Sequence, residues 1–210
     1  NHTLSVNIDR IWRRRAVNEV RRANPRRILG VATGTGDLAI ALARRIRDVQ
    51  VMGVDLSEEM LAVARRKVEA RGLDSRIVLE RGDAEHLEVA DASVDAATVA
   101  FGVRNFGDLA AGLRELARTI RPGGKVVILE FSRPRNRVFR ALYEFYSYKI
   151  LPRIGGLVSR DKRAYEYLPA SVGEFPAPAE FLGMMEKAGF RNCRAKNQSC
   201  GIAQIYIGER

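Results

Sequence analysis

The chain has 210 residues, of which 46% are hydrophobic, so it can bury one substantial core, and no composition shift divides it; we expect a single domain over 1–210. No apolar run approaches the roughly 20 residues that span a bilayer, and nothing at the N-terminus resembles a signal peptide, which argues against an integral membrane or secreted protein and for a soluble one. The 36 Lys+Arg outnumber the 25 Asp+Glu to give a net charge of +11, which favours polyanionic partners such as nucleic acid or anionic lipid without choosing between them.

A helix followed by a glycine loop opens the chain. Apolar residues at helical spacing over 3–20 predict an amphipathic helix, with Arg13 on its polar side. The stretch 27–37 then reads as a buried strand, a glycine loop and the start of a second helix. Gly34 and Gly36 let a ligand approach the backbone, and the helix directs unpaired N–H groups toward it. Glycines also serve simply to make such turns, so this loop alone is a weak signal.

Two acidic residues end later strands and strengthen that signal. Asp55 closes the apolar run 49–54, nineteen residues after Gly36, and Asp83 closes the next run. A carboxylate at the first position can accept both hydroxyl protons of a ribose. A nucleotide-like ligand across the carboxyl ends of adjacent strands would meet the loop and then each acid in turn.

Strands and helices alternate along the rest of the chain. Further strands are expected at 77–79, 94–100, 126–131, 190–198 and 201–208. Further helices are expected from Ser57 to about Gly72, and at 109–120 and 181–188, with a loop at 101–108. This alternation predicts an α/β fold: a mainly parallel, seven-stranded sheet with helices on both faces, closed by a C-terminal hairpin that contributes an antiparallel strand.

Aromatic residues gather in one segment. The segment 132–176 holds eight of the fifteen aromatic residues of the chain, and it interrupts the alternation of strands and helices. We expect it to form a substrate pocket or a membrane-facing cap for a large apolar substrate, the alternative being that the rings pack into the core.

The glycine loop, Asp55 and Asp83 together resemble the S-adenosylmethionine site of a Rossmann-like class I methyltransferase. Further runs narrow the resemblance to the ubiquinone/menaquinone biosynthesis C-methyltransferase family (UbiE/MenG type). These runs are 101–106, 121–124, 129–134 and 167–176, and the opening residues fit as well. The likeness covers nearly the whole chain, and its specific part is the run that contains Arg104 and Asn105.

The resemblance implies S-adenosylmethionine as the cofactor and no metal. The implied cofactor-binding residues are Thr33, Gly34, Thr35, Gly36, Asp37, Asp55, Leu56, Asp83, Ala84 and Ala100. Within that set Asp55 would bind the ribose, and the Asp83–Ala84 pair would lie near the adenine. The sequence departs from the family at Gly30, where an acid usually lies close to the methionine ammonium, so we expect modest cofactor affinity.

The implied reaction moves a methyl group to a ring carbon of a polyprenylated quinol, in menaquinone or ubiquinone biosynthesis. Demethylmenaquinol and a 2-polyprenyl-benzoquinol both remain open as substrates. Arg104 would stabilise a phenolate or orient a water that takes the proton, with Asn105 fixing the geometry, and the base itself is not identified. His86 is interpreted as a surface residue. The family implies a cytoplasmic protein associated peripherally with the membrane and no specific nucleic acid.

Three other functions fit parts of the sequence. An RNA methyltransferase would explain the charge, although no catalytic Cys motif or base-stacking motif is found. A dehydrogenase would use Gly34, Gly36 and Ala39 as G-x-G-x-x-A with Asp55 suited to NAD, but the Arg104 run and the aromatic segment argue against it. A basic, non-catalytic membrane scaffold would explain Gly30. The oligomeric state is left open.

Overall fold

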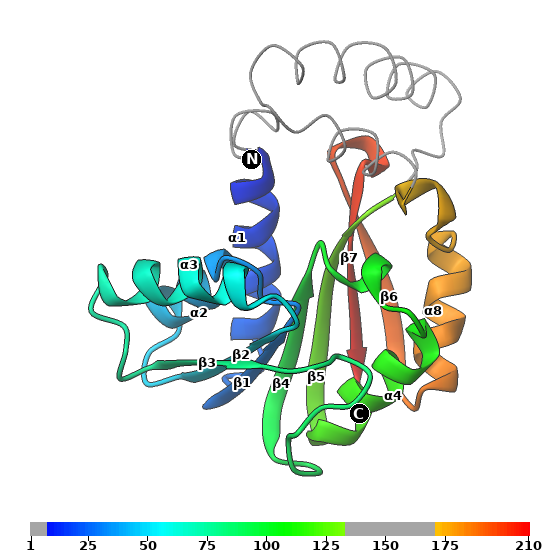
Figure 1. The fold of residues 1–210 in the computed structure, drawn as a ribbon. Coiled ribbons are helices and arrows are strands. Elements are labelled where there is room, and N and C mark those ends of the chain that lie inside the picture. Colours follow the sequence, from blue (N-terminus) through cyan, green and yellow to red (C-terminus); the bar gives the residue numbers. More distant parts are fainter. Residues whose placement is uncertain (1–7, 133–170) are drawn as a thin grey trace, which may run out of the picture.

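The computed structural model describes residues 8–132 and 171–210, so most of the expected aromatic cap at 132–176 lies outside the described residues. Within them the alternation of strands and helices is confirmed (Figure 1). The strands are β1 (Arg27–Val31), β2 (Gln50–Asp55), β3 (Ile77–Arg81), β4 (Val94–Ala100), β5 (Ile120–Phe131), β6 (Arg191–Gln198) and β7 (Ala203–Glu209). The helices are α1 (Ile8–Arg21), α2 (Asp37–Arg45), α3 (Glu58–Glu69), α4 (Leu109–Thr119) and α8 (Pro178–Lys187), with short 3₁₀ turns η1 (Val103–Asn105) and η3 (Ser199–Gly201).

The described strands form one seven-stranded sheet in the order β3-β2-β1-β4-β5-β7-β6. Strands β1 to β5 pair in parallel, whereas β7 pairs antiparallel with both β5 and β6. The expected fold class and the C-terminal hairpin are therefore confirmed. The chain order reverses between β1 and β4, and ligands of open α/β sheets bind outside the carboxyl ends of the strands at such a reversal.

Helices cover both faces of the sheet, because successive strand residues point to opposite sides. Ile28 of β1 belongs to the core packed under α1 and α2, and its neighbour Leu29 belongs to the core under α4 and α8. Both side chains are almost fully buried. In Figure 1 the helices α1, α2 and α3 lie toward the left of the sheet and α4 and α8 toward the right.

Local signals set the helix boundaries near the cavity described below. Ser57 caps α3 by accepting from the Met60 N–H at 3.3 Å, and Asp108 caps α4 by accepting from the Ala111 N–H at 2.9 Å. Strand β5 begins at Ile120, six residues before the expected 126. The reason is that Ile120 already pairs with Val94, and a register shift after that pair accommodates Pro122, Gly123 and Gly124 within the strand.

Candidate active site

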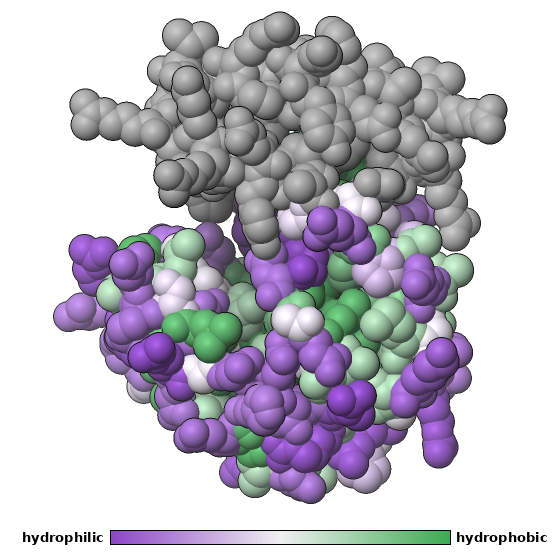
Figure 2. Space-filling model, turned by 45° about the vertical axis from the view of Figure 1, so that its right-hand side comes forward, coloured by the Kyte–Doolittle hydropathy of each residue, from purple (hydrophilic) through white to green (hydrophobic). Residues whose placement is uncertain are grey.

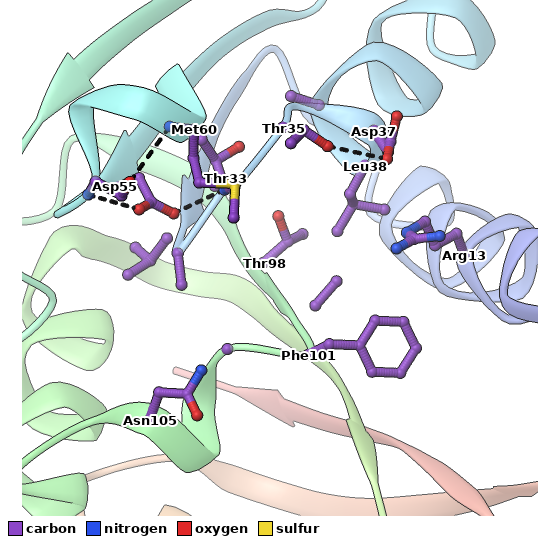
Figure 3. Close-up of a pocket in the computed structure, with 18 residues that line it drawn as sticks. Arg13, Thr33, Thr35, Asp37, Leu38, Asp55, Met60, Thr98, Phe101 and Asn105 are labelled. Carbon is purple, nitrogen blue, oxygen red and sulfur yellow. Dashed lines mark hydrogen bonds between the residues drawn. The ribbon is translucent and has the colours of Figure 1, made fainter. Parts of the chain in front are cut away.

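A cavity of about 320 Å³ opens at the carboxyl ends of β1, β2 and β4. Figure 3 shows side chains converging on it from the glycine loop, from the end of β2, from the loop after β4 and from α1. The cavity therefore lies at the reversal of strand order, as expected for a ligand site.

The glycine loop turns through left-handed backbone. Ala32, Gly34 and Gly36 have φ values of 49°, 55° and 77°. A Cβ atom added to Gly34 would meet nothing within 4 Å, so the loop leaves open space beside its backbone. Helix α2 begins at Asp37, directly after the loop, and its first N–H groups favour a polar or anionic group at this point.

Asp55 is held in place by two backbone groups. Its Oδ2 accepts from the Gly34 N–H at 2.7 Å, and its Oδ1 accepts from the Ser57 N–H at 2.9 Å. Each carboxylate oxygen has a further lone pair. The side chain lines the cavity, so it can accept a pair of hydroxyl groups while it connects the glycine loop to the start of α3.

The structure brings together most of the residues expected to bind the cofactor. Those that line the cavity are Thr33, Gly34, Thr35, Asp37, Asp55 and Ala100. The other expected residues are not among the lining residues: Gly36, Leu56, Asp83 and Ala84. Gly36 is buried against α3, where an added Cβ would approach the Ala64 Cβ to 3.1 Å.

The residues expected near the adenine are Asp83 and Ala84. The Asp83 carboxylate accepts from the Glu85 N–H at 2.9 Å, and Ala84 is buried. Leu56 is 61% exposed directly after Asp55. His86 is exposed, as expected.

Several lining residues were not foreseen. They are Arg13, Met60, Thr98 and Phe101. The helical spacing predicted Arg13 on the polar side of its helix, but the structure turns it toward the cavity. Met60 lies three residues after Ser57, a spacing that places both side chains on the same side of the start of α3.

A glycine borders the cavity where an acid was expected. Gly30 has no left-handed φ, and a Cβ added there would meet Thr33 Oγ1 at 3.5 Å and Thr98 Oγ1 at 3.8 Å, which are ordinary contacts. Thr98 is 2% exposed, and its hydroxyl has no hydrogen-bond partner in the part of the chain that the structure describes. The position therefore accepts a side chain, and the cavity wall carries an unsatisfied hydroxyl.

Arg104 is surrounded by protein groups. Its Nη1 donates to Glu130 Oε1 at 2.6 Å and to the Phe101 carbonyl at 2.7 Å, and its Nε donates to Ser171 Oγ at 3.3 Å. The guanidinium carbon lies 5.4 Å from the centroid of the Phe131 ring. The side chain is only 9% exposed and is not among the cavity-lining residues. Arg104 thus ties the loop after β4 to β5 and to the start of the C-terminal part.

The partner of Arg104 is a fully buried carboxylate. Glu130 is 0% exposed and also accepts from the backbone N–H groups of Arg104 and Phe131. Burial raises the pKa of Glu130, and the neighbouring Arg104 charge opposes that rise. Such a pair is strongly interdependent, because removal of one charge leaves the other buried and uncompensated.

Asn105, the residue after Arg104, differs from Arg104 in its exposure. It is exposed and lines the cavity from η1 (Figure 3). Of the two residues expected to act in catalysis, Asn105 is therefore the one that faces the cavity.

One aromatic ring, Phe101, forms a wall of the cavity, and two further rings, Trp12 and Phe131, pack against it. Phe101 lines the cavity, and its ring centroid lies 4.5 Å from that of Phe131 and 6.2 Å from that of Trp12. The Trp12 Nε1 donates to Ser199 Oγ at 3.0 Å, which ties α1 to η3. Phe101 has a left-handed φ of 59°, so β4, like β1, ends in strained backbone at the cavity.

The sheet with its antiparallel β7, and the cavity with its glycine loop and Asp55, define a class I S-adenosylmethionine-dependent methyltransferase. A solved S-adenosylmethionine-dependent methyltransferase from Aquifex aeolicus shares this fold, with a TM-score of 0.66 and 18% identity over 92% of this chain and 89% of that one. A putative O-methyltransferase from Nostoc punctiforme gives a TM-score of 0.72 over 94% of this chain and 55% of that one, at 18% identity.

The chain belongs to the ubiE/COQ5 methyltransferase family, whose model matches residues 1–210. It is 46% identical to a ubiquinone/menaquinone biosynthesis C-methyltransferase of Geobacter sulfurreducens, over 100% of this chain and 82% of the relative. It is also 46% identical to a demethylmenaquinone methyltransferase of Thermus thermophilus, over 100% of this chain and 94% of the relative. This membership identifies a methyltransferase and not a dehydrogenase.

None of the described helices combines the length and the apolar character needed to cross a bilayer. The face seen in Figure 2 is largely hydrophilic, with smaller groups of apolar side chains between the polar ones.

Proposed function

We propose that this protein transfers a methyl group from S-adenosylmethionine to a ring carbon of a polyprenylated quinol. The observation that carries the proposal is the division of the cavity into a polar half and an aromatic wall. The polar half has Asp55 and the glycine loop, and the wall has Phe101. The quinone class comes from the names of the relatives, of which one refers to ubiquinone and menaquinone biosynthesis and the other to demethylmenaquinone.

The residues of the polar half fit the cofactor, which when bound supplies an electrophilic methyl group on a sulfonium. Asp55 would accept the ribose hydroxyls with the lone pairs left by its two backbone contacts. The open backbone at Gly34 admits a ligand that a side chain would block. The unsatisfied Thr98 hydroxyl, which lies between Asp55 and Phe101 in Figure 3, offers the cofactor a further polar contact.

The substrate ring carbon needs activation because carbon is a poor nucleophile. Loss of a proton from the neighbouring ring hydroxyl raises the electron density at that carbon, so the protein must favour the phenolate and align the ring. We assign Asn105, which lines the cavity, to hold the ring hydroxyl. We assign Arg104 a positioning role, because its donors to Glu130 and Phe101 fix the loop that carries Asn105.

The aromatic wall has a matching task. Phe101, packed on Phe131 and Trp12, would stack with the quinol ring and keep water from the reacting carbon. On sequence grounds we assign the prenyl chain to the aromatic segment 132–176, as the cap of a single domain.

Incubation with S-adenosylmethionine and each reduced quinone tests the function directly. We expect one methyl group on the ring of demethylmenaquinol or of the polyprenyl-benzoquinol, read by mass spectrometry, and the preferred ring identifies the substrate. S-adenosylmethionine should raise the melting temperature and NAD should not. Methylation of RNA with both quinols left unchanged would contradict the proposal.

We further infer a peripheral association with anionic membranes, which would give the protein access to a prenylated substrate. The outer face of α1 exposes Ile8 and Ile11, at 37% and 51%, beside the exposed Arg10 and Arg14. Such a face suits the headgroup region of a bilayer. Sedimentation with anionic vesicles should retain the protein, more weakly at high salt. Ile11→Asp should reduce retention, and an unchanged Ile11→Asp variant would contradict this surface.

A further inference from the structure

Arg13 projects from α1 into the end of the cavity that lies farthest from Asp55. Its side chain is 20% exposed and lines the cavity. In Figure 3 Arg13 and Phe101 lie on one side, and Asp55 and Met60 lie on the other, with Thr98 between them. A ligand with two ends that places a ribose at Asp55 would therefore direct its other end toward Arg13.

The guanidinium is oriented by two protein groups. Its Nη1 forms an ion pair with Asp9, one turn earlier on α1, and its central carbon lies 5.3 Å from the centroid of the Phe101 ring. Asp9 is itself buried. In residues 8–132 and 171–210 the Nε and Nη2 groups of Arg13 have no hydrogen-bond partner, so these donors remain for a ligand.

The charges around Arg13 favour an anion. The ionisable residues that line the cavity, among those described, are Arg13, Asp37 and Asp55. The Asp37 carboxylate is paired with Lys67 at 2.8 Å, and Gly30 supplies no acid. Arg13 is thus the cation that lines this end of the cavity; Asp9 balances its charge from outside the cavity, and the two donor groups left on its fork match a carboxylate in geometry as well as in charge.

We propose that Arg13 binds the carboxylate of the methionine part of S-adenosylmethionine. The inference rests on the proposed function, because it assumes that this cofactor occupies the cavity. It assigns the N-terminal helix to cofactor recognition, together with the strand ends, and it makes Asp9 the residue that positions Arg13.

Calorimetric titration with three ligands tests the assignment. S-adenosylmethionine has both the carboxylate and the ammonium, decarboxylated S-adenosylmethionine has only the ammonium, and 5′-methylthioadenosine has neither. Arg13→Gln should weaken S-adenosylmethionine roughly tenfold or more, the usual size for a charge-assisted contact. The same change should leave the other two ligands within about twofold. Arg13→Lys should fall between the wild type and Arg13→Gln.

Arg14→Gln is the matched control, because Arg14 is the exposed neighbour on the same helix and does not line the cavity. It should bind all three ligands like the wild type. Melting temperatures without ligand show whether each variant is folded. If Arg13→Gln is not folded, the titration of Arg13→Lys tests the assignment instead.

The outcomes separate the two proposals. A wild-type protein without affinity for S-adenosylmethionine would overturn the proposed function and this inference with it. Tight wild-type binding with no loss in Arg13→Gln, or with equal losses for all three ligands, would overturn the inference alone. A raised KM for the quinol with unchanged cofactor affinity would assign Arg13 to the substrate and would also overturn it.

Discussion

Each edge of the sheet holds an aspartate that accepts from two backbone N–H groups, but the two aspartates lie in different surroundings. At the carboxyl edge Asp55 accepts from the N–H groups of Gly34 and Ser57. At the amino edge the N–H groups of Arg26 and Arg27 both donate to one oxygen of Asp95, Oδ2. A hollow lies beside each carboxylate, of about 320 Å³ at the first and about 410 Å³ at the second.

The two edges differ in what surrounds the acid. Asp95 is paired with Arg121 at 2.8 Å, whereas Asp55 has no cationic partner in the described residues. Helices α2 and α3 begin beside Asp55 and direct their free N–H groups at its hollow. Of the two edges, the carboxyl edge therefore combines a carboxylate that has no cationic partner in the described residues with helix N-termini, which is the combination that we expect at a ligand site.

The largest expected effect concerns Arg104, which anchors the loop of the carboxyl edge. Arg104→Ala leaves Glu130 buried without its cation, so we expect it to lower the free energy of unfolding by about 3–5 kcal/mol. Denaturant unfolding measures this loss. The double variant Arg104→Met/Glu130→Leu should recover part of it, because it removes both charges but leaves the N–H groups of residue 104 and Phe131 without their acceptor, and a double variant as unstable as the single one would contradict this account.

The loss in Arg104→Ala should also depend on pH. Burial raises the pKa of Glu130 above the unfolded value, and Arg104→Ala removes the charge that opposes the rise, leaving only the backbone N–H groups of residue 104 and Phe131 to oppose it. The native variant then binds a proton more readily than the unfolded chain, so its stability is greatest below the unfolded pKa and falls as pH rises through the native pKa. Unfolding at pH 5 and pH 8 should show a smaller difference from the wild type at the lower pH.

A paired substitution tests the comparison of the edges itself. Asp55→Ala should weaken S-adenosylmethionine by about 1.5–3 kcal/mol, or roughly tenfold or more, because it removes charge-assisted bonds to the ribose. Asp95→Ala removes the same number of backbone contacts at the other edge and should leave the affinity unchanged. Both should lose stability, since each strands two N–H groups. Equal affinity losses would show that the effect of Asp55 is structural.

The smallest effect is a gain at Gly30. Gly30→Asp should tighten the binding of S-adenosylmethionine by fivefold or more, about 1 kcal/mol or above. The reason is that the new carboxylate, beside the Thr33 and Thr98 hydroxyls, would pair with the methionine ammonium. The backbone there has no left-handed φ, so the variant should fold normally. Gly30→Asn separates shape from charge in the same titration. A stable Gly30→Asp variant that binds no better would show that the ammonium is already satisfied elsewhere.

Strand-end residues could be predicted from the sequence because their position follows from the chain pattern. Asp55 closes an apolar run, and parallel strands bring their ends to one edge, so its place at the cavity needed no knowledge of packing. The mainly parallel pairing was likewise predicted from the alternation of strands and helices, whereas the order of the strands comes from the structure.

Side-chain directions could not be predicted, because they depend on groups distant in the sequence. Arg104 is held by Glu130, which is 26 positions away, and no local spacing links the two. Arg13 lies on a helix whose periodicity identifies its polar side but not the cavity that this side meets. The sequence shows a glycine at position 30, where the family usually has an acid. Whether a side chain fits there could be judged only from the positions of Thr33 and Thr98.

The place of β7 in the sheet has a consequence for the order in which the chain assembles during synthesis. Strand β6 is made first, yet within the described sheet it pairs only with β7. Until Ala203–Glu209 has left the ribosome, β6 has no partner and the open side of β5 remains uncovered. Unpaired strand edges promote association between chains. A nascent chain halted before Ala203 should therefore aggregate, although its cofactor loop and Asp55 were completed long before.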